Sequence, residues 1–65
     1  MNLLLNGDPI STDAETLDTV LAENGYADAT VATAVNGDFV PVTLRATHTL
    51  TDGDQIEVLA PMQGG

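Results

Sequence analysis

The fold is decided by the opening stretch Met1-Asn2-Leu3-Leu4-Leu5-Asn6-Gly7-Asp8-Pro9-Ile10-Ser11-Thr12, which has the pattern of two short strands joined by a tight turn. Side chains alternate along a strand, so Leu3 and Leu5 share one face and Leu4 lies on the other. Asn and Gly between the strands supply the positive φ angles of a hairpin turn. Pro9 has no backbone N–H to donate, so the second strand is predicted at an edge of the sheet.

A short amphipathic helix is predicted over residues 17–24, because apolar side chains recur at helical spacing from Leu17. Two starting points compete. Thr12-x-x-Glu15 has the form of a capping box, whereas Thr16 stands immediately before the apolar pattern and is favoured as the N-cap.

The end of the helix is marked by Gly25, which adopts the left-handed backbone conformation without strain. The next residue, Tyr26, is then expected to contact Leu21, as in the Schellman ending of a helix.

Further strands are predicted in the second half of the chain. Residues 30–35 are a run of β-branched residues and alanine that ends in a second Asn-Gly turn, so Phe39-Val40 is expected to pair with it before Pro41 ends the strand. Residues 42–50 are polar and irregular, with Leu44 and Leu50 as apolar anchors.

The last strand is predicted over residues 55–59, after the turn Asp52-Gly53-Asp54, with Ile56 and Val58 pointing inward. The order β-β-α-β-β-β predicts an α+β fold, a mixed sheet of four to five strands with one short helix on one face. With the last strand parallel to the first, this is a β-grasp, or ubiquitin-like, roll. Residues 1–60 are expected to form the domain, and residues 61–65 a flexible tail.

Charge and composition exclude several classes of function. The sequence has ten acidic residues and one basic residue, Arg45, so the net charge is −9. Nucleic acids and anionic membranes both require basic side chains, so neither is expected as a partner, and a protein partner should present a basic face. Without cysteine there is no disulfide or zinc–thiolate site, and a single histidine builds no metal site. No apolar run is long enough to span a membrane, and the cytoplasm is the expected location.

Enzyme motifs are missing from the sequence. Ser11 is the only serine, and no adjacent histidine or helix start activates it. His48 is expected to be a solvated loop residue, and Asp52-Gly53-Asp54 lacks the downstream acid of a calcium-binding loop. The sequence therefore predicts a protein that is not an enzyme, with no catalytic residue, no metal and no permanently bound cofactor.

The terminal Gly64-Gly65 is the one segment that suggests chemistry. Glycine has no Cβ, so such a tail passes through a narrow channel and brings its carboxylate close to ATP in an activating enzyme. Taken alone, a terminal Gly-Gly also fits a frayed end. Its position about five residues after the last predicted β-grasp strand gives it functional weight.

Several segments carry a resemblance to a known family. The most specific are Val35-Asn36-Gly37-Asp38-Phe39-Val40-Pro41 and Asp52-Gly53-Asp54-Gln55-Ile56-Glu57, and residues 1–7, residues 16–21 and Gly64-Gly65 complete the pattern. Over essentially its whole length the chain resembles the ThiS family of bacterial sulfur carriers in thiamine biosynthesis. It departs from the pattern at Pro61-Met62-Gln63, where many relatives have a short apolar stretch, and at Val42, where a basic residue commonly follows the proline.

The resemblance implies a function. An E1-like adenylating enzyme, using ATP and magnesium, would activate the carboxylate of Gly65. A persulfide sulfur supplied by a sulfurtransferase or cysteine desulfurase would displace AMP and leave a thiocarboxylate. Thiazole synthase would then take this sulfur to build the thiazole ring. Gly65 is the expected covalent carrier and Gly64 the residue recognised in the tail.

A partner-binding patch is expected on the outer face of the sheet, formed by Leu4, Leu59 and Met62. Three alternative functions stay open at this point. They are the sulfur-carrying small subunit of molybdopterin synthase, a ubiquitin-like protein modifier, and a structural β-grasp adaptor without tail chemistry.

Overall fold

The computed structural model describes residues 1–60, and the predicted tail at 61–65 lies outside the described residues. The elements in chain order are β1 (Asn2–Leu5), β2 (Asp8–Ser11), α1 (Leu17–Glu23), β3 (Ala32–Val35), β4 (Asp38–Val40), the 3-10 helix η1 (Val42–Leu44) and β5 (Gln55–Leu59). The predicted order of strands and helix is confirmed. The 3-10 helix lies in the segment that was expected to be irregular.

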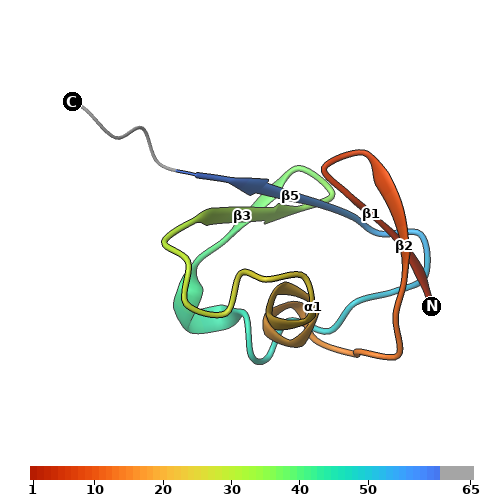
Figure 1. The fold of residues 1–65 in the computed structure, drawn as a ribbon, viewed down its shortest axis with the longest axis horizontal. Coiled ribbons are helices and arrows are strands. Elements are labelled where there is room, and N and C mark those ends of the chain that lie inside the picture. Colours follow the sequence, from red (N-terminus) through yellow and green to blue (C-terminus); the bar gives the residue numbers. More distant parts are fainter. Residues whose placement is uncertain (61–65) are drawn as a thin grey trace.

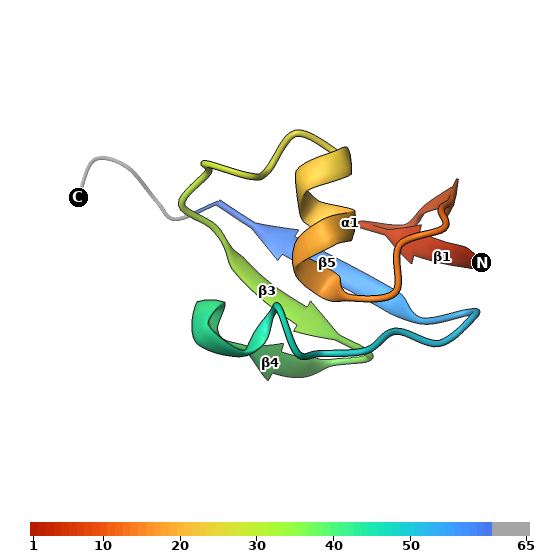
Figure 2. The same ribbon diagram turned by 90° about the horizontal axis from the view of Figure 1, so that it is seen from below.

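The five strands form one mixed sheet in the order β2-β1-β5-β3-β4. β1 and β5 are parallel neighbours at the centre, and the other pairs are antiparallel. α1 lies across one face of this sheet and leaves the other face uncovered by the helix (Figures 1 and 2). The β-grasp prediction is therefore confirmed, and Pro9 lies on the edge strand β2, opposite Leu4, as its missing N–H indicated.

The core lies between the sheet and α1. Leu3 and Ile56 from the two central strands are almost fully buried against Leu17 and Val20 of the helix. Leu5 is also buried and Leu4 only partly, which confirms the predicted facing of β1. Alternate residues of the strands supply one side of the core, and the i, i+3, i+4 face of the helix supplies the other.

Both predicted Asn-Gly turns occur, with φ of +51° at Asn6 and +85° at Gly7, and nearly the same values at the second turn. The asparagine side chains also hold the central strand. The Asn6 Oδ1 atom accepts a hydrogen bond from the Val58 backbone N–H at 2.8 Å. The Asn36 Oδ1 atom accepts one from the Gln55 backbone N–H at 3.0 Å. Each hairpin turn therefore also fixes the position of β5.

The helix ends as predicted. The backbone N–H of Tyr26 donates to the carbonyl of Leu21 at 2.8 Å and that of Gly25 donates to Ala22 at 3.2 Å, which is the hydrogen-bond pair of a Schellman ending. The Tyr26 side chain is half-buried and packs against the core. This ending turns the chain sharply from α1 toward β3.

Thr16 is the N-cap residue, but its side chain makes no capping hydrogen bond. The first helical N–H groups are instead satisfied by the loop before β5, since Leu17 donates to the His48 carbonyl at 3.0 Å and Asp18 to the Arg45 carbonyl at 3.2 Å. The capping box at Thr12 does not form. The Thr12 hydroxyl accepts a hydrogen bond from the Ala14 backbone N–H at 3.0 Å and donates to a carboxylate oxygen of Glu23 at 2.6 Å. The helix start is thus fixed by tertiary contacts rather than by a local cap.

Two details of the segment 30–50 differ from prediction. β3 begins at Ala32 rather than residue 30. Leu50 is buried as expected, but Leu44 is 52% exposed, so the prediction that it anchors the loop is wrong. The guanidinium of Arg45, the next residue, makes the contacts that hold this part of the loop to the sheet.

Candidate functional site

The face of the sheet opposite α1 is nearly free of charge. Strand alternation and register place ten side chains on this outer face: Asn2, Leu4, Pro9, Ser11, Ala32, Ala34, Phe39, Gln55, Glu57 and Leu59. Among these ten, only Glu57 carries a charge. An uncharged face on a protein of net charge −9 is unlike the rest of its surface, and such faces commonly bind other proteins.

The apolar part of this face is a shallow groove of about 210 Å³ over β3, β4 and β5. Phe39 and Leu59 are its two large apolar side chains, 68% and 71% exposed. Ala32 lies directly across from Leu59 and Ala34 directly across from Phe39. The small alanine side chains form the floor of the groove between the two large side chains. Glu57 also lines the groove. The arrangement offers two apolar contacts and one carboxylate to a partner.

Phe39 was not among the sequence-predicted patch residues. The signal was present, because Phe39 alternates with Val40, whose side chain is buried. Once Val40 is assigned to the core, its neighbour on a short strand must point to the outer face. Ala32 and Ala34 point to this same side, since they pair with Leu59 and Glu57.

Leu4 and Leu59 lie on the same face but not side by side. Leu4 pairs with Gln55, four residues before Leu59 on β5, and four residues of strand span about 13 Å. Gln55 and Glu57 project between them. The apolar neighbours of Leu59 are therefore Phe39 and the two alanines rather than Leu4. Met62, Gly64 and Gly65 lie outside the described residues.

The other nine acidic residues lie off the outer face, on the helix, in turns and loops, and at the first positions of β2 and β4 (Asp8 and Asp38). Two of them have structural roles. Asp52 accepts a hydrogen bond from the Asn2 backbone N–H at 2.6 Å, and Asp54 accepts one from the Thr51 backbone N–H at 2.8 Å. The predicted turn at 52–54 is confirmed, and it ties the start of β1 to the start of β5.

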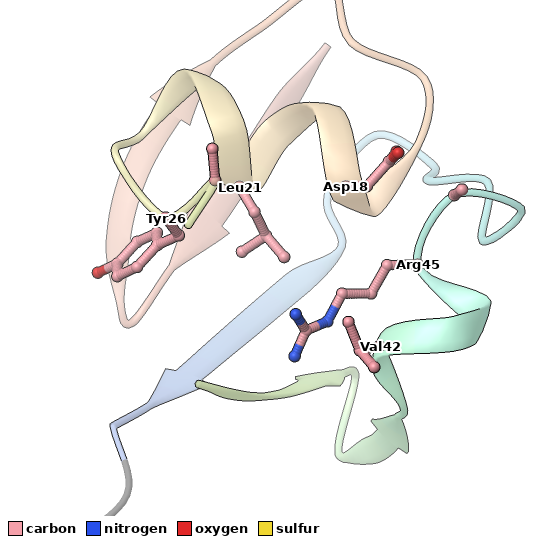
Figure 3. Close-up of a pocket in the computed structure, with 7 residues that line it drawn as sticks. Asp18, Leu21, Tyr26, Val42 and Arg45 are labelled. Atoms are coloured by element: carbon pink, nitrogen blue, oxygen red, sulfur yellow. The ribbon is translucent and has the colours of Figure 1, made fainter. Parts of the chain in front are cut away.

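A second hollow, of about 170 Å³, lies on the other side of the molecule, between α1 and the segment after β4. Figure 3 shows the Arg45 side chain extending between Leu21 and Val42, with Tyr26 and Asp18 at the margins. The Thr16 hydroxyl donates to the Asp18 carboxylate at 2.6 Å, and this hydrogen bond lowers the pKa of Asp18. The hollow is lined by the one basic side chain of the protein, whose donors are directed into the fold.

Arg45 connects the loop to the sheet. Its Nε donates to the Thr33 hydroxyl at 3.0 Å, and its Nη2 donates to the Val31 carbonyl at 2.6 Å. The Thr33 hydroxyl is buried and donates in turn to the carbonyl of Val40 at 2.8 Å. Arg45 is thus the head of a short chain of hydrogen bonds that crosses β3 and β4.

We expect Arg45→Met to lower the free energy of unfolding by about 1–2 kcal/mol and Tm by roughly 5–15 °C, because it removes two charge-assisted hydrogen bonds while keeping an apolar stem. Thermal unfolding followed by circular dichroism measures both. Arg45→Lys separates charge from geometry, since it keeps the net charge of −9 but has one donor group for two acceptors. Full stability in Arg45→Lys would show that the charge matters and the hydrogen bonds do not.

No catalytic arrangement appears in the part of the chain that the structure describes. Ser11 is exposed on the edge strand β2, and the role of His48 in the fold comes from its backbone carbonyl. Within residues 1–60, no group of three or more histidine or acidic side chains is placed to hold a metal ion. Over the same residues, no helix is long and apolar enough to cross a membrane.

Comparisons with known proteins agree on one family. The model of the ThiS family matches residues 3–65. A crystal structure of a thiamine biosynthesis protein (ThiS) from Geobacter metallireducens is similar over the full length of both chains, with 35% identity and a TM-score of 0.84. A solution structure of a thiamine biosynthesis protein from the same organism has 30% identity and a TM-score of 0.76, covering 100% of this chain and 88% of the other. A search of curated proteins found no match.

Proposed function

Because this chain belongs to the ThiS family, the non-catalytic sulfur carriers of thiamine biosynthesis, we propose that it carries sulfur as a thiocarboxylate on Gly65 and delivers it to thiazole synthase. The observation that supports this most directly is the family match, which runs through the β-grasp body and includes Gly64-Gly65. The predicted family is confirmed. The chemistry at Gly65 and the identity of the acceptor are the proposal.

The proposed reaction begins in an E1-like adenylating enzyme. The carboxylate of Gly65 attacks the α-phosphorus of ATP, which the enzyme binds with magnesium, and pyrophosphate leaves. The terminal sulfur of a persulfide, supplied by a sulfurtransferase or cysteine desulfurase, then attacks the acyl adenylate and AMP leaves. A thiol then attacks the donor's sulfur in the resulting acyl disulfide and forms a new disulfide with it, and the thiocarboxylate leaves on the carrier. We propose that the reaction takes place in the cytoplasm, where ATP is available.

The composition of the chain supports a terminal carrier site. The sequence contains no cysteine, so no side chain can hold the sulfur as a persulfide. We propose that residues 1–60 act as the recognised body and residues 61–65 as the segment that enters partner active sites. Gly65 is the sixth residue after Leu59, and six extended residues reach about 20 Å. A carboxylate at that distance enters an active site while the outer face stays bound at its entrance.

We propose the outer face, with Leu59 and Phe39 at its centre and Leu4 at its far side, as the surface that docks on the adenylating enzyme and on thiazole synthase. Its apolar groove lies where β5 ends, so a partner bound there is beside the start of the segment that carries Gly65. Met62 extends the proposed contact along that segment. Gly64 is the residue that we expect the activating enzyme to recognise by its lack of a Cβ.

The direct test of the proposed chemistry is the intact mass of the protein after co-expression with its E1-like enzyme and a cysteine desulfurase. The expected product is heavier than the unmodified protein by the mass difference between sulfur and oxygen, and fragmentation should place the change at Gly65. Mutating the nucleotide site of the activating enzyme should abolish the product. A chain that stays unmodified in the presence of active enzymes would contradict the proposal.

We expect Leu59→Asp to weaken binding to the adenylating enzyme by at least about tenfold, since it puts a charge at the centre of an apolar contact. Because Leu59 is 71% exposed, the free energy of unfolding should change by no more than about 0.5 kcal/mol. Isothermal titration calorimetry measures the binding. Leu44→Asp is the matched control, because it makes the same change at an exposed leucine off the outer face. Equal weakening in both variants would show that general charge, not this face, is responsible.

The same reasoning applies to Leu4→Asp, which should weaken binding and leave the fold intact. Its effect should be smaller than that of Leu59→Asp, because Leu4 lies about 13 Å from Leu59 along the sheet. If Leu4→Asp proves to be the more damaging of the two, the partner contacts the β1 side of the face rather than the groove.

A further inference from the structure

Glu57 is the single charge on the outer face, and its position is central. It lies on β5 two residues before Leu59, and it pairs directly with Ala34, which in turn pairs with Phe39. Two residues along a strand span about 7 Å, and two neighbouring strand spacings about 10 Å. Glu57 therefore lines the same groove as both large apolar side chains.

The side chains around Glu57 supply little to compensate its charge. On the outer face its neighbours across β3 are alanines, and its neighbours along β5 are Gln55 and Leu59. The single basic residue of the sequence, Arg45, directs its guanidinium to Thr33 and Val31. Glu57 is exposed, so water solvates its carboxylate in the free protein.

This arrangement constrains any protein that covers the groove. A surface that buries Phe39 and Leu59 must also cover Glu57, because all three line one hollow. Removing an ionised carboxylate from water without a partner is strongly unfavourable. The covering surface must therefore supply a cation, and the overall charge of −9 favours a basic surface as well.

We propose that Glu57 is a specificity-determining residue of the carrier and that it pairs with one lysine or arginine set within an apolar contact surface on the E1-like adenylating enzyme. This inference rests on the proposed function, and it adds the chemistry of the partner surface to it. Phe39 and Leu59 supply the contact area. Glu57 fixes the register of docking and excludes apolar surfaces that lack a base.

The test compares Glu57→Gln with Glu15→Gln, using the full-length chain and its purified adenylating enzyme. Both variants remove one negative charge with the same isostere. Glu15 is exposed in the segment between β2 and α1, away from the outer face. Surface plasmon resonance at low and high salt gives the association and dissociation rates. Thermal unfolding confirms that both variants keep the wild-type Tm, as expected for exposed side chains.

Glu57→Gln should raise the dissociation rate about tenfold and change the association rate less than twofold, because a charge pair enclosed in an interface acts mainly on dissociation. Glu15→Gln should change only the association rate, by less than about twofold, and the change should disappear at high salt. Glu57→Arg should weaken binding further than Glu57→Gln, since it sets two like charges against each other.

Two results would overturn the inference while leaving the proposed function intact. One is that Glu57→Gln binds as Glu15→Gln does, although the wild type forms the thiocarboxylate and Leu59→Asp binds weakly. The other is that Glu57→Gln keeps its affinity for the enzyme but self-associates in sedimentation velocity. Glu57 would then serve to keep the apolar face from pairing with a second copy. Failure of the wild type to bind the enzyme or form a thiocarboxylate would instead reject the proposed function and this inference together.

Discussion

Deletion of Gly65 should abolish adenylation of the chain, and Gly64→Ala should reduce it by at least about 100-fold. Deletion moves the terminal carboxylate back by one residue, more than 3 Å along an extended chain, and displacements of about 1 Å already cost enzymes this factor. Gly64→Ala adds a Cβ where we propose a narrow channel. The measurement is pyrophosphate exchange into ATP, catalysed by the adenylating enzyme with each variant as substrate.

Neither change should alter the thermal stability of the protein. The core residues that the structure describes all belong to residues 1–60, so Tm should stay within about 3 °C of the wild type. Gln63→Ala is the matched control, because position 63 already carries a Cβ and the chain length is unchanged. Wild-type exchange rates with Gly64→Ala would contradict the steric role of Gly64, and exchange after deletion of Gly65 would contradict its role as the carrier.

The sequence was sufficient for the sheet and the helix because its local signals agree with the tertiary structure. Asn6-Gly7 and Asn36-Gly37 specify two hairpins by backbone conformation alone. Pro9 marks an edge strand by its missing donor, and Gly25 ends the helix. In each case the residue type restricts the backbone by itself, so the prediction needed no knowledge of distant contacts.

The features that could not be predicted depend on contacts between distant segments. Nothing near Arg45 in the sequence indicates that its guanidinium reaches Thr33 and Val31, 12 and 14 residues away. The apolar side chain of Leu44 predicts an anchor for the loop, yet Arg45 holds the loop and Leu44 is exposed. The helix start is likewise fixed by carbonyls of the loop 45–48 rather than by a cap.

In the candidate site, one feature follows from the local sequence and another depends on contacts between distant segments. The outward direction of Leu4 and Leu59 followed from alternation within their own strands. Their separation did not, because the register that sets Leu4 opposite Gln55 is a property of the parallel pairing of β1 with β5. Phe39 joins the site through a second register, between β4 and β3. The two registers together place the apolar part of the outer face around Leu59 and Phe39 rather than around Leu59 and Leu4.

The purified thiocarboxylate should support formation of the thiazole ring by thiazole synthase, with deoxyxylulose phosphate and the glycine-derived imine as the other substrates. Sulfur is a stoichiometric component of the ring, so the unmodified carboxylate form should give no product above background. Chromatography and mass spectrometry of the thiazole phosphate product measure whether the ring forms. The Leu59→Asp variant, converted to its thiocarboxylate, tests whether the outer face also docks on the synthase.

Growth distinguishes this acceptor from the alternative one, molybdopterin synthase. A cell lacking the gene should require thiamine or its thiazole precursor and should keep its molybdenum enzymes active. A plasmid with the wild-type gene should restore growth, and one lacking the Gly65 codon should not, because the proposed carrier atom is then missing. Growth without thiamine, combined with lost molybdenum-enzyme activity, would reassign the sulfur to the molybdopterin pathway. That result would leave the β-grasp fold and the position of Glu57 on the outer face unchanged, since neither depends on the acceptor.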